Sequence, residues 1–247
     1  KLYINMAFIS KCFLILSLIG VLNGVLFFLL KENDTIRQTF FASLCASMAR
    51  TSSPEMKKIR CDLLKNENIK GKVLEIGFGP GTNLNCFSNQ TNTNIESYVG
   101  IEPNVNFDKF IVDELTKTRL NFPFEVKHGF AESLDDFEDE SIDTVISTHV
   151  LCSVDELDDA LDEIYRVLKP GGSFVFLEHV STDDDSWTTS IQRNIRPVWR
   201  VFGDGCEFRD IASALKASFQ GKMHLKIDEF LAPFPKLLQF VSPHVKG

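Results

Sequence analysis

The order of apolar and polar positions divides the chain into three regions. An uncharged apolar run extends from Cys12 to Leu30, and the positions after it mix polar and apolar residues as far as Lys70. From Lys72 onward, short segments with a strand pattern alternate with longer amphipathic segments. Strands joined by helices form a mostly parallel sheet with helices on both faces. The pattern therefore predicts a doubly wound α/β fold.

Five short segments in the last region carry the strand pattern. The expected strands are 72–76, 97–101, 123–127, 142–148 and 173–179. The clearest helix is expected from Asp155 to Leu168, where the apolar residues fall on one face, and the KPGG sequence at 169–172 ends it. In such sheets ligands bind at the carboxyl ends of the strands, so the residues just after each strand are the candidates for a site.

The apolar run from Cys12 to Leu30 is long enough to cross a membrane, since a helix of this length spans the roughly 30 Å hydrocarbon core. A cleaved signal peptide and a buried core helix are the alternatives. The run is longer than a usual signal core and no small-residue cleavage site follows it, so an anchor is favoured. Basic residues on both sides leave open whether it spans the bilayer or lies in one leaflet. The chain begins with Lys1, and Met6 is the expected natural start.

The segment between the apolar run and the α/β region has two helical stretches, broken at Thr51 to Pro54. The second stretch begins with Pro54, a residue that suits the first position of a helix. It is interpreted either as a cap over a cofactor cleft or as a plain connecting helix. The expected regions are a hydrophobic anchor at 1–31, a helical neck or cap at 32–70 and an α/β domain at 71–247.

Composition narrows the class of partner. The 247-residue chain has a formal net charge of −8 and shows no basic stripe, which disfavours a nucleic-acid partner. The six cysteines show no CxxC pair and no histidines at zinc spacing, so we expect free thiols and no metal. They are Cys12, Cys45, Cys61, Cys86, Cys152 and Cys206.

The stretch VLEIGFGPGTN, from Val73 to Asn83, carries an apolar strand into a glycine-rich turn. Glycines permit a tight turn and let a ligand approach the backbone closely. A dinucleotide-binding turn carries its third glycine where this chain has Thr82, and a phosphate-binding P-loop carries a lysine that is absent here. Glu102 follows the next expected strand, where the two oxygens of a carboxylate suit the two hydroxyls of a ribose.

Four motifs in order over this region resemble those of class I S-adenosylmethionine-dependent methyltransferases. They are the glycine turn, HGFAESL, IDTVISTHVLCSV and IYRVLKPGGSFVFLEHV. The resemblance implies a seven-stranded Rossmann-like methyltransferase fold, with S-adenosylmethionine as cofactor. In that family Ala131 and Glu132 would flank the adenine, and Glu75 would orient the ammonium directly or through water. The implied cofactor residues are Glu75, Gly77, Gly79, Gly81, Asn83, Glu102, Pro103, Asn104, Ala131, Glu132, Thr148 and His149.

Further segments resemble the animal membrane-anchored methyltransferase-like proteins of the endoplasmic reticulum and lipid droplets. They are the N-terminal apolar run, PNVNF, LCSV, LEHV, SW, DGC and PHVKG. This resemblance implies S-methylation of small lipophilic alkyl thiols by a domain that faces the cytosol from the membrane or lipid-droplet surface. His149 departs from the pattern, because an apolar residue is expected there in that group.

Methyl transfer from a sulfonium is an in-line displacement, so the protein mainly has to align the reacting atoms. A thiol with a pKa near 8.5 is mostly protonated at neutral pH, and a base would raise its reactive fraction. The candidate catalytic residues are His149, His179 and Asp204. Each also has a structural interpretation. The aromatic residues Trp187, Trp199 and Phe202 either line an acceptor pocket or pack in the core.

Two other functions remain open from the sequence. One is methylation of a membrane lipid, at a quinone ring carbon or a phospholipid amine, and the other is an inactive cofactor-binding protein on a lipid surface. Methylation of a nucleic-acid base is disfavoured, because the Asn/Asp-Pro-Pro-aromatic segment of such enzymes is replaced here by Thr148 to Leu151.

Overall fold

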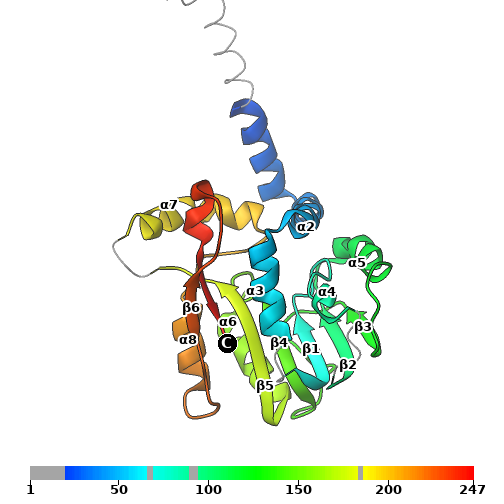
Figure 1. The fold of residues 1–247 in the computed structure, drawn as a ribbon. Helices are drawn as coiled ribbons and strands as arrows, with labels where there is room; N and C mark the ends of the chain where they lie inside the picture. The colour runs from blue at the N-terminus through cyan, green and yellow to red at the C-terminus, as the bar shows by residue number, and fades with distance from the viewer. Residues whose placement is uncertain (1–19, 66–68, 89–93, 183–185) are drawn as a thin grey trace, which may run out of the picture.

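The computed structural model describes residues 20–65, 69–88, 94–182 and 186–247. The first part of the expected anchor, residues 1–19, lies outside the described residues. Residues 20–32 form a helix that projects from the body of the protein (Figure 1). Among the helices that the structure describes, none is at once long enough and apolar enough to cross a bilayer.

The core of the fold is a seven-stranded sheet in the order β3-β2-β1-β4-β5-β7-β6. The first five strands pair in parallel, and β7 pairs antiparallel with both β5 and β6. This confirms the predicted mostly parallel sheet. The strands are β1 (Lys70–Ile76), β2 (Asn94–Ile101), β3 (Phe124–Lys127), β4 (Ile142–Thr148), β5 (Leu168–His179), β6 (Asp228–Leu231) and β7 (Pro243–Lys246).

Helices cover both faces of the sheet, because the strand residues alternate between two apolar clusters. On one face Leu74 of β1 packs with α6 and α8, whereas Val73 packs on the other face with α2, α3 and α5. The helices are α2 (Asp34–Thr51), α3 (Pro54–Leu64), α4 (Leu84–Phe87), α5 (Asp108–Leu115), α6 (Leu157–Val167), α7 (Trp187–Phe202) and α8 (Ile211–Phe219), with 3-10 turns η1 (Val105–Phe107) and η2 (Lys236–Val241).

The fifth strand is longer than the sequence predicted. It begins at Leu168, directly after α6, and contains the KPGG segment, which was expected to end the helix and precede the strand. Ile142 pairs with Leu168 and Thr144 pairs with Ser173, so the register shifts between these pairs. The extra residues therefore form an irregularity within β5, and the helix still ends where the glycines were expected to stop it.

The neck contains the two predicted helices, but α2 rather than α3 covers the loops at the strand ends. The amide of Asn104, after β2, donates a hydrogen bond to the Gln38 carbonyl of α2 (2.9 Å). Helix α3 packs instead against α4 and β5, on the face of the sheet (Figure 1). Of the two interpretations that the sequence left open for α3, these contacts favour the connecting helix. A helix period alone does not tell which surface the helix meets.

Cys61 of α3 and Cys86 of α4 form a disulfide bond, whereas Cys45, Cys152 and Cys206 are free thiols. The expectation of free cysteines was therefore wrong for the Cys61–Cys86 pair. The two helices contact each other, and no spacing rule along the chain reveals such a contact. The bond links the neck to the segment that follows the glycine turn.

Candidate active site

The glycine turn leads directly out of β1, between β2 and β4. Gly77 and Gly79 have φ values of +61° and +55°, which a residue with a side chain adopts only at a cost. A Cβ at Gly77 would strike the side chain of Val150, at 2.3 Å. A Cβ at Gly79 would meet only the Gly77 carbonyl, at 4.0 Å, among the described residues. Gly77 is thus required by packing, while Gly79 borders open space where a ligand has room.

Glu102, at the end of β2, is buried and holds the glycine turn in place. Its Oε2 accepts a hydrogen bond from the Gly79 N–H (2.8 Å), and its Oε1 accepts one from the Asn104 N–H (2.9 Å). Burial raises the pKa of Glu102 to about 7, and the two backbone donors partly offset this rise. The carboxylate is thus oriented beside the turn, in the place expected for an acid that binds ribose hydroxyls.

Glu75 lies in a buried network beneath the turn. Both of its oxygens accept hydrogen bonds, one from the Asn83 amide (2.7 Å) and the other from the Tyr98 hydroxyl. The Asn83 amide also donates to the Thr148 hydroxyl (2.9 Å). Burial raises the pKa of Glu75 to about 8. Glu75 thus acts on the site through Asn83, and the amide of Asn83 connects the turns after β1 and β4.

Asn83 supplies a buried acceptor that the protein leaves unused. Its Oδ1 has no hydrogen-bond partner among the described residues. A buried polar atom of this kind normally has a partner, so a donor from a ligand is expected there. The ammonium of S-adenosylmethionine is such a donor. Together with the open space at Gly79 and the carboxylate of Glu102, this orphaned oxygen shows that the residues present fit the cofactor that the motifs imply.

The remaining cofactor candidates lie along the same edge of the sheet. Ala131 is buried and Pro103 is exposed. Glu132 accepts a hydrogen bond from the Asp155 N–H (2.6 Å), so its carboxylate holds the loop before α6. Gly81 is buried, and a Cβ there would press on the ring of Phe78, at 3.2 Å.

The turn after β4 is held by a second buried carboxylate, Glu178. Its oxygens accept hydrogen bonds from the Ser147 hydroxyl (2.6 Å) and the Val150 N–H (2.9 Å). These contacts support the left-handed backbone of His149, whose φ is +60°. Burial raises the pKa of Glu178. The turn is thus over-determined by its neighbours, which is how a strained residue persists at a functional site.

His149 forms a pair with His244 of β7, a residue that the sequence did not assign. Their Nε2 atoms lie 3.0 Å apart. Burial lowers the pKa of His244 to about 4. Desolvation by the surrounding protein and the adjacent His244 hold the pKa of His149 well below its usual value, although the residue as a whole is exposed. Both imidazoles are therefore neutral at neutral pH.

The proton positions in this pair follow from the partner of His244. Its Nδ1 lies 2.9 Å from the Ser242 carbonyl, which can only accept, so Nδ1 carries the proton. The Nε2 of His244 then accepts from His149 Nε2–H. This leaves the Nδ1 lone pair of His149 as the basic position. The PHVKG motif, which contains His244, was the available signal for this residue.

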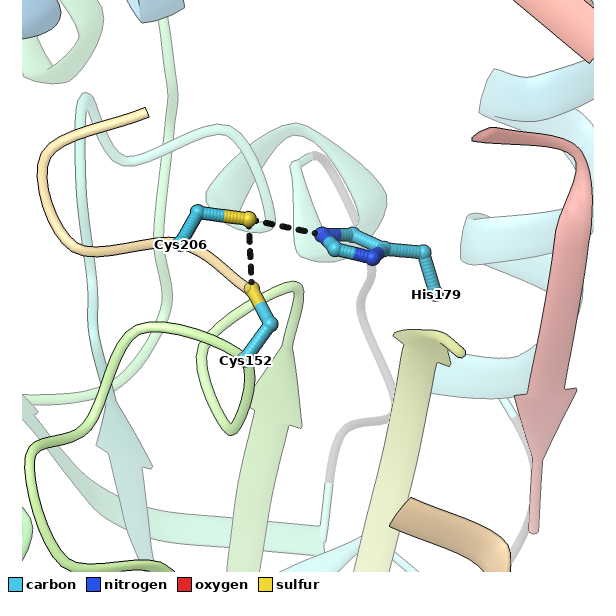
Figure 2. A group of neighbouring side chains, drawn as sticks. All are labelled: Cys152, His179 and Cys206. Atoms are coloured by element: carbon cyan, nitrogen blue, oxygen red, sulfur yellow. Dashed lines mark hydrogen bonds between the residues drawn. The ribbon is translucent and has the colours of Figure 1, made fainter. Parts of the chain in front are cut away.

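The second predicted histidine, His179, lies at the end of β5 beside two cysteines (Figure 2). Its Nε2 is 3.1 Å from the Cys206 sulfur, which is 3.2 Å from the Cys152 sulfur. All three side chains are buried. The contact with Cys152 and burial raise the pKa of Cys206, so it is a neutral thiol in the protein alone. Residue spacing along the chain did not reveal this cluster, because the proximity of the two cysteines depends on two separate loops.

Asp204 lies in the loop before α8 with a φ of +47°. Its carboxylate binds the Arg37 guanidinium of α2 at 2.7 Å. The predicted catalytic acid is therefore engaged in an ion pair that joins α2 to this loop. The contact gives Asp204 a structural role between α2 and this loop, and its catalytic role stays a prediction.

The three aromatic candidates lie in different parts of the structure. Trp199 stacks on Phe208 and donates its indole N–H to the Cys206 sulfur (3.2 Å). Phe202 contacts Phe27 and lies at the junction with the N-terminal helix. Trp187 is 79% exposed and lines no interior pocket. Only Trp199 adjoins the histidine and cysteine residues.

The chain is similar in sequence to known methyltransferases. A family model described as "Methyltransferase domain" matches residues 74–176. Thiol S-methyltransferase TMT1A of Homo sapiens is 36% identical over 182 residues, which is 72% of this chain and 70% of that protein. Thiol S-methyltransferase TMT1B of Rattus norvegicus is 32% identical over 225 residues, which is 86% of each protein.

A solved structure shares the fold at lower identity. It is an S-adenosylmethionine-dependent methyltransferase of Thermotoga maritima, described as a possible histamine N-methyltransferase, with a TM-score of 0.55 and 22% identity. The alignment covers 77% of this chain and 83% of that one. At this identity the likeness establishes the fold alone.

Replacing Gly79 by Leu is expected to abolish cofactor binding without unfolding the protein. The left-handed backbone costs a non-glycine residue about 1–2 kcal/mol, or roughly 2–8 °C in Tm for a chain of this size. The side chain would enter the ligand space, and we expect calorimetry to show at least a 100-fold loss of affinity, or about 2.7 kcal/mol. Gly171→Leu is the matched control, because Gly171 has a φ of +78° and open space around it among the described residues. Equal binding loss in both variants would contradict this assignment.

Cofactor affinity is expected to fall as the pH drops below about 7. Burial raises the pKa of Glu102 to about 7, so below that pH the free protein holds this carboxyl protonated. Ribose hydroxyls favour the ionised form, so binding must expel the proton and affinity falls by up to about tenfold per pH unit. Calorimetry in two buffers of different ionisation enthalpy measures the proton released. Glu102→Gln should bind more weakly and lose this component. An unchanged pH slope in that variant would exclude Glu102 as its source.

Proposed function

The chain belongs to the S-adenosylmethionine-dependent methyltransferase family, and we propose that its acceptor is the sulfur of a small lipophilic alkyl thiol. The relatives that match over most of their length are named thiol S-methyltransferases. That likeness favours a thiol over a quinone or a phospholipid amine. It also makes an active enzyme a better interpretation than a cofactor-binding protein without turnover.

The observation that carries the proposal is the neutral base at the end of β4. A thiol loses its proton before it attacks, and the Nδ1 lone pair of His149 is placed to take it. His244 fixes the tautomer that exposes this lone pair, and Glu178 fixes the turn that presents the ring. A base with a low pKa does not hold a proton of its own at neutral pH.

The cofactor, when bound, supplies a methyl group on a positively charged sulfur. The chain's residues do the rest: Glu102 and the glycine turn orient the cofactor, and His149 accepts the thiol proton. Loss of the proton to His149 would leave the acceptor as a thiolate aligned with the methyl group that the cofactor would supply, and His149 would pass the proton on to solvent. Alignment of these atoms is the main source of acceleration in such a displacement.

We also propose that the enzyme works at the membrane of the endoplasmic reticulum or lipid droplet. The described part of the N-terminal helix supports this, since Val21, Leu22 and Phe28 are each about 60% exposed (63%, 59% and 62%). Helix α7 lies across the base of that helix (Figure 1), where Phe202 contacts Phe27. The exposed Trp187 at the start of α7 suits the interface between lipid and water.

The cytosolic orientation that we propose has a consequence for the Cys61–Cys86 pair. Disulfides persist in oxidising compartments, and the cytosol keeps most thiols reduced. The structure joins the pair in a disulfide, and in a domain facing the cytosol we expect it to be reduced in the cell, whereas in the lumen it would stay closed. The redox state of these two cysteines in the cell therefore reports which side of the membrane the domain faces.

Purified full-length protein with S-adenosylmethionine is expected to methylate simple alkyl thiols, measured by transfer of a labelled methyl group. His149→Ala should lower kcat by about 100-fold at neutral pH, in the usual range for loss of a general base. The deficit should shrink above the pKa of the thiol, because the thiolate then forms without help. This pH-dependent recovery distinguishes a base from a residue that only maintains the fold.

The matched control for that experiment is His224→Ala, since His224 is exposed and outside the strand-end cluster. A panel of quinones and phospholipids is assayed beside the thiols. Turnover of a lipid with none of a thiol would replace the proposed acceptor. Intact cofactor binding without any turnover would favour the inactive protein.

Trp187 is expected to enter the membrane interface when the full chain is reconstituted in phosphatidylcholine vesicles. Its fluorescence should shift to shorter wavelength and be quenched by bromine atoms near the lipid headgroups, because the indole leaves water for the interface. The difference spectrum between wild type and Trp187→Phe isolates its signal from that of Trp199. Emission typical of water, with ready quenching by acrylamide, would show that α7 does not touch the membrane.

A further inference from the structure

Three side chains with metal-binding atoms converge at the carboxyl ends of β4 and β5. They are Cys152, His179 and Cys206, and their ligand atoms all lie within 4.8 Å of one another (Figure 2). Each comes from a different segment: the loop after β4, the end of β5 and the loop before α8. All three are buried. The fold therefore gathers two thiols and an imidazole that the sequence keeps far apart.

The protein alone does not satisfy this group. The Nδ1 atom of His179 is buried and finds no partner within the part of the chain that the structure describes, whereas its Nε2 faces the Cys206 sulfur (Figure 2). A buried Nδ1 of this kind commonly marks a missing water, and such an outer partner would orient the ring so that Nε2 can bind an ion. The indole N–H of Trp199 donates to the Cys206 sulfur (3.2 Å), as outer groups do to the sulfur ligands of metals.

The donor set matches a particular class of ion. Two cysteine sulfurs and one histidine nitrogen are ligands that Zn²⁺ prefers, with bonds of about 2.0–2.3 Å. Tetrahedral coordination places such atoms roughly 3.5–3.8 Å apart. Two of the observed separations, 3.1 Å and 3.2 Å, are slightly shorter than this, and the third is within 4.8 Å, so binding an ion requires side-chain shifts of up to about 1 Å.

The cluster offers three protein ligands, which is the number typical of a catalytic zinc site. Structural zinc sites usually have four protein ligands, whereas catalytic sites have three and keep one position open. His149 and His244, the nearest other histidines, are paired with each other through their Nε2 atoms. The cluster thus supplies three ligands and leaves the fourth position to a small molecule.

The cluster adjoins the cofactor cleft. The Cys45 thiol of α2 interacts electrostatically with both Glu102 and Cys206. His149, which follows β4, stacks beside His179 with ring centroids 6.1 Å apart. An ion held by His179 would therefore lie near the base that we assign.

We propose that Cys152, His179 and Cys206 bind one Zn²⁺ ion, and that its open position receives the sulfur of the acceptor thiol. The metal site stands on the geometry alone, while the identity of its fourth ligand rests on the proposed thiol methylation. Coordination of a thiol to Zn²⁺ deprotonates it at neutral pH. The site therefore provides a bound thiolate in a buried place where a free thiol would stay protonated.

The bonds made and broken in this reaction balance without any further reagent. The two cysteines lose their protons when the ion binds. The acceptor thiol then displaces a metal-bound water, and His149 takes the thiol proton. The sulfur attacks the methyl carbon, the old carbon–sulfur bond breaks, and its electron pair stays on the cofactor sulfur. The thioether product has no charge and is a weak ligand, so water replaces it.

Metal content tests the site independently of activity. The full chain, purified without chelators from zinc-supplemented cells, is expected to hold about one zinc per chain by plasma mass spectrometry. Cys152→Ser, Cys206→Ser and His179→Gln should each lower zinc affinity by more than about 100-fold, since loss of an outer partner alone costs 10- to 100-fold. Cys45→Ser and His224→Gln are the matched controls and should retain the metal.

Replacement by Co²⁺ shows what occupies the fourth position. The cobalt protein should show thiolate-to-cobalt charge transfer in the near ultraviolet, and an alkyl thiol added without cofactor should intensify it. A metal-free native protein, or a Cys152–Cys206 disulfide found by mass spectrometry in its place, would overturn the site. Zinc bound by the ligand-loss variants as tightly as by the wild type would do the same.

The outcomes also separate the two proposals. If zinc is bound but thiols are not methylated, the function is wrong and the metal site stands. If the zinc-free wild-type protein methylates thiols as fast as the zinc-loaded protein, the function stands and the role of the metal is wrong. A cobalt spectrum that does not respond to thiol would likewise exclude the acceptor as the fourth ligand.

Discussion

The buried carboxylate of Glu102 is the contact on which the rest of the site depends. It binds the backbone of the glycine turn at Gly79 and of the next loop at Asn104, and Asn104 in turn binds α2. One side chain thus orders the turn, the end of β2 and the cap. Burying a carboxylate is unfavourable, and its raised pKa of about 7 measures how incompletely the two backbone donors offset that cost.

Two further carboxylates repeat this arrangement beneath the neighbouring turns. Glu75 holds Asn83 after β1, and Glu178 holds the turn that carries His149 after β4. Burial raises the pKa of both. The loops of the site are therefore fixed from below by polar groups inside the sheet, while the residues above them stay available for a ligand. Such networks give a rigid site at some expense of stability, which is common where geometry matters for chemistry.

Helix α2, which covers the loops at the strand ends, also holds the loop before α8 in place. Arg37 of α2 pairs with Asp204, and Asp204 lies two residues before Cys206 in the same loop. The position of α2 is thereby coupled to the histidine and cysteine cluster as well as to the cofactor loop. Because α2 follows directly on the N-terminal helix, the membrane attachment that we propose and the organisation of the site would involve the same segment.

The sequence by itself determined the fold class and the cofactor, because their signals are local. The strand at 142–148 was placed correctly from its apolar pattern. In the glycine turn, Thr82 argued against a dinucleotide-binding motif and the absence of a lysine argued against a P-loop. Only the tertiary structure decided which distant residues meet. The Cys61–Cys86 bond, the Arg37–Asp204 pair and the cluster of Cys152, His179 and Cys206 each join segments far apart in the chain. Strand order and helix packing set those contacts, and residue spacing along the chain does not encode them.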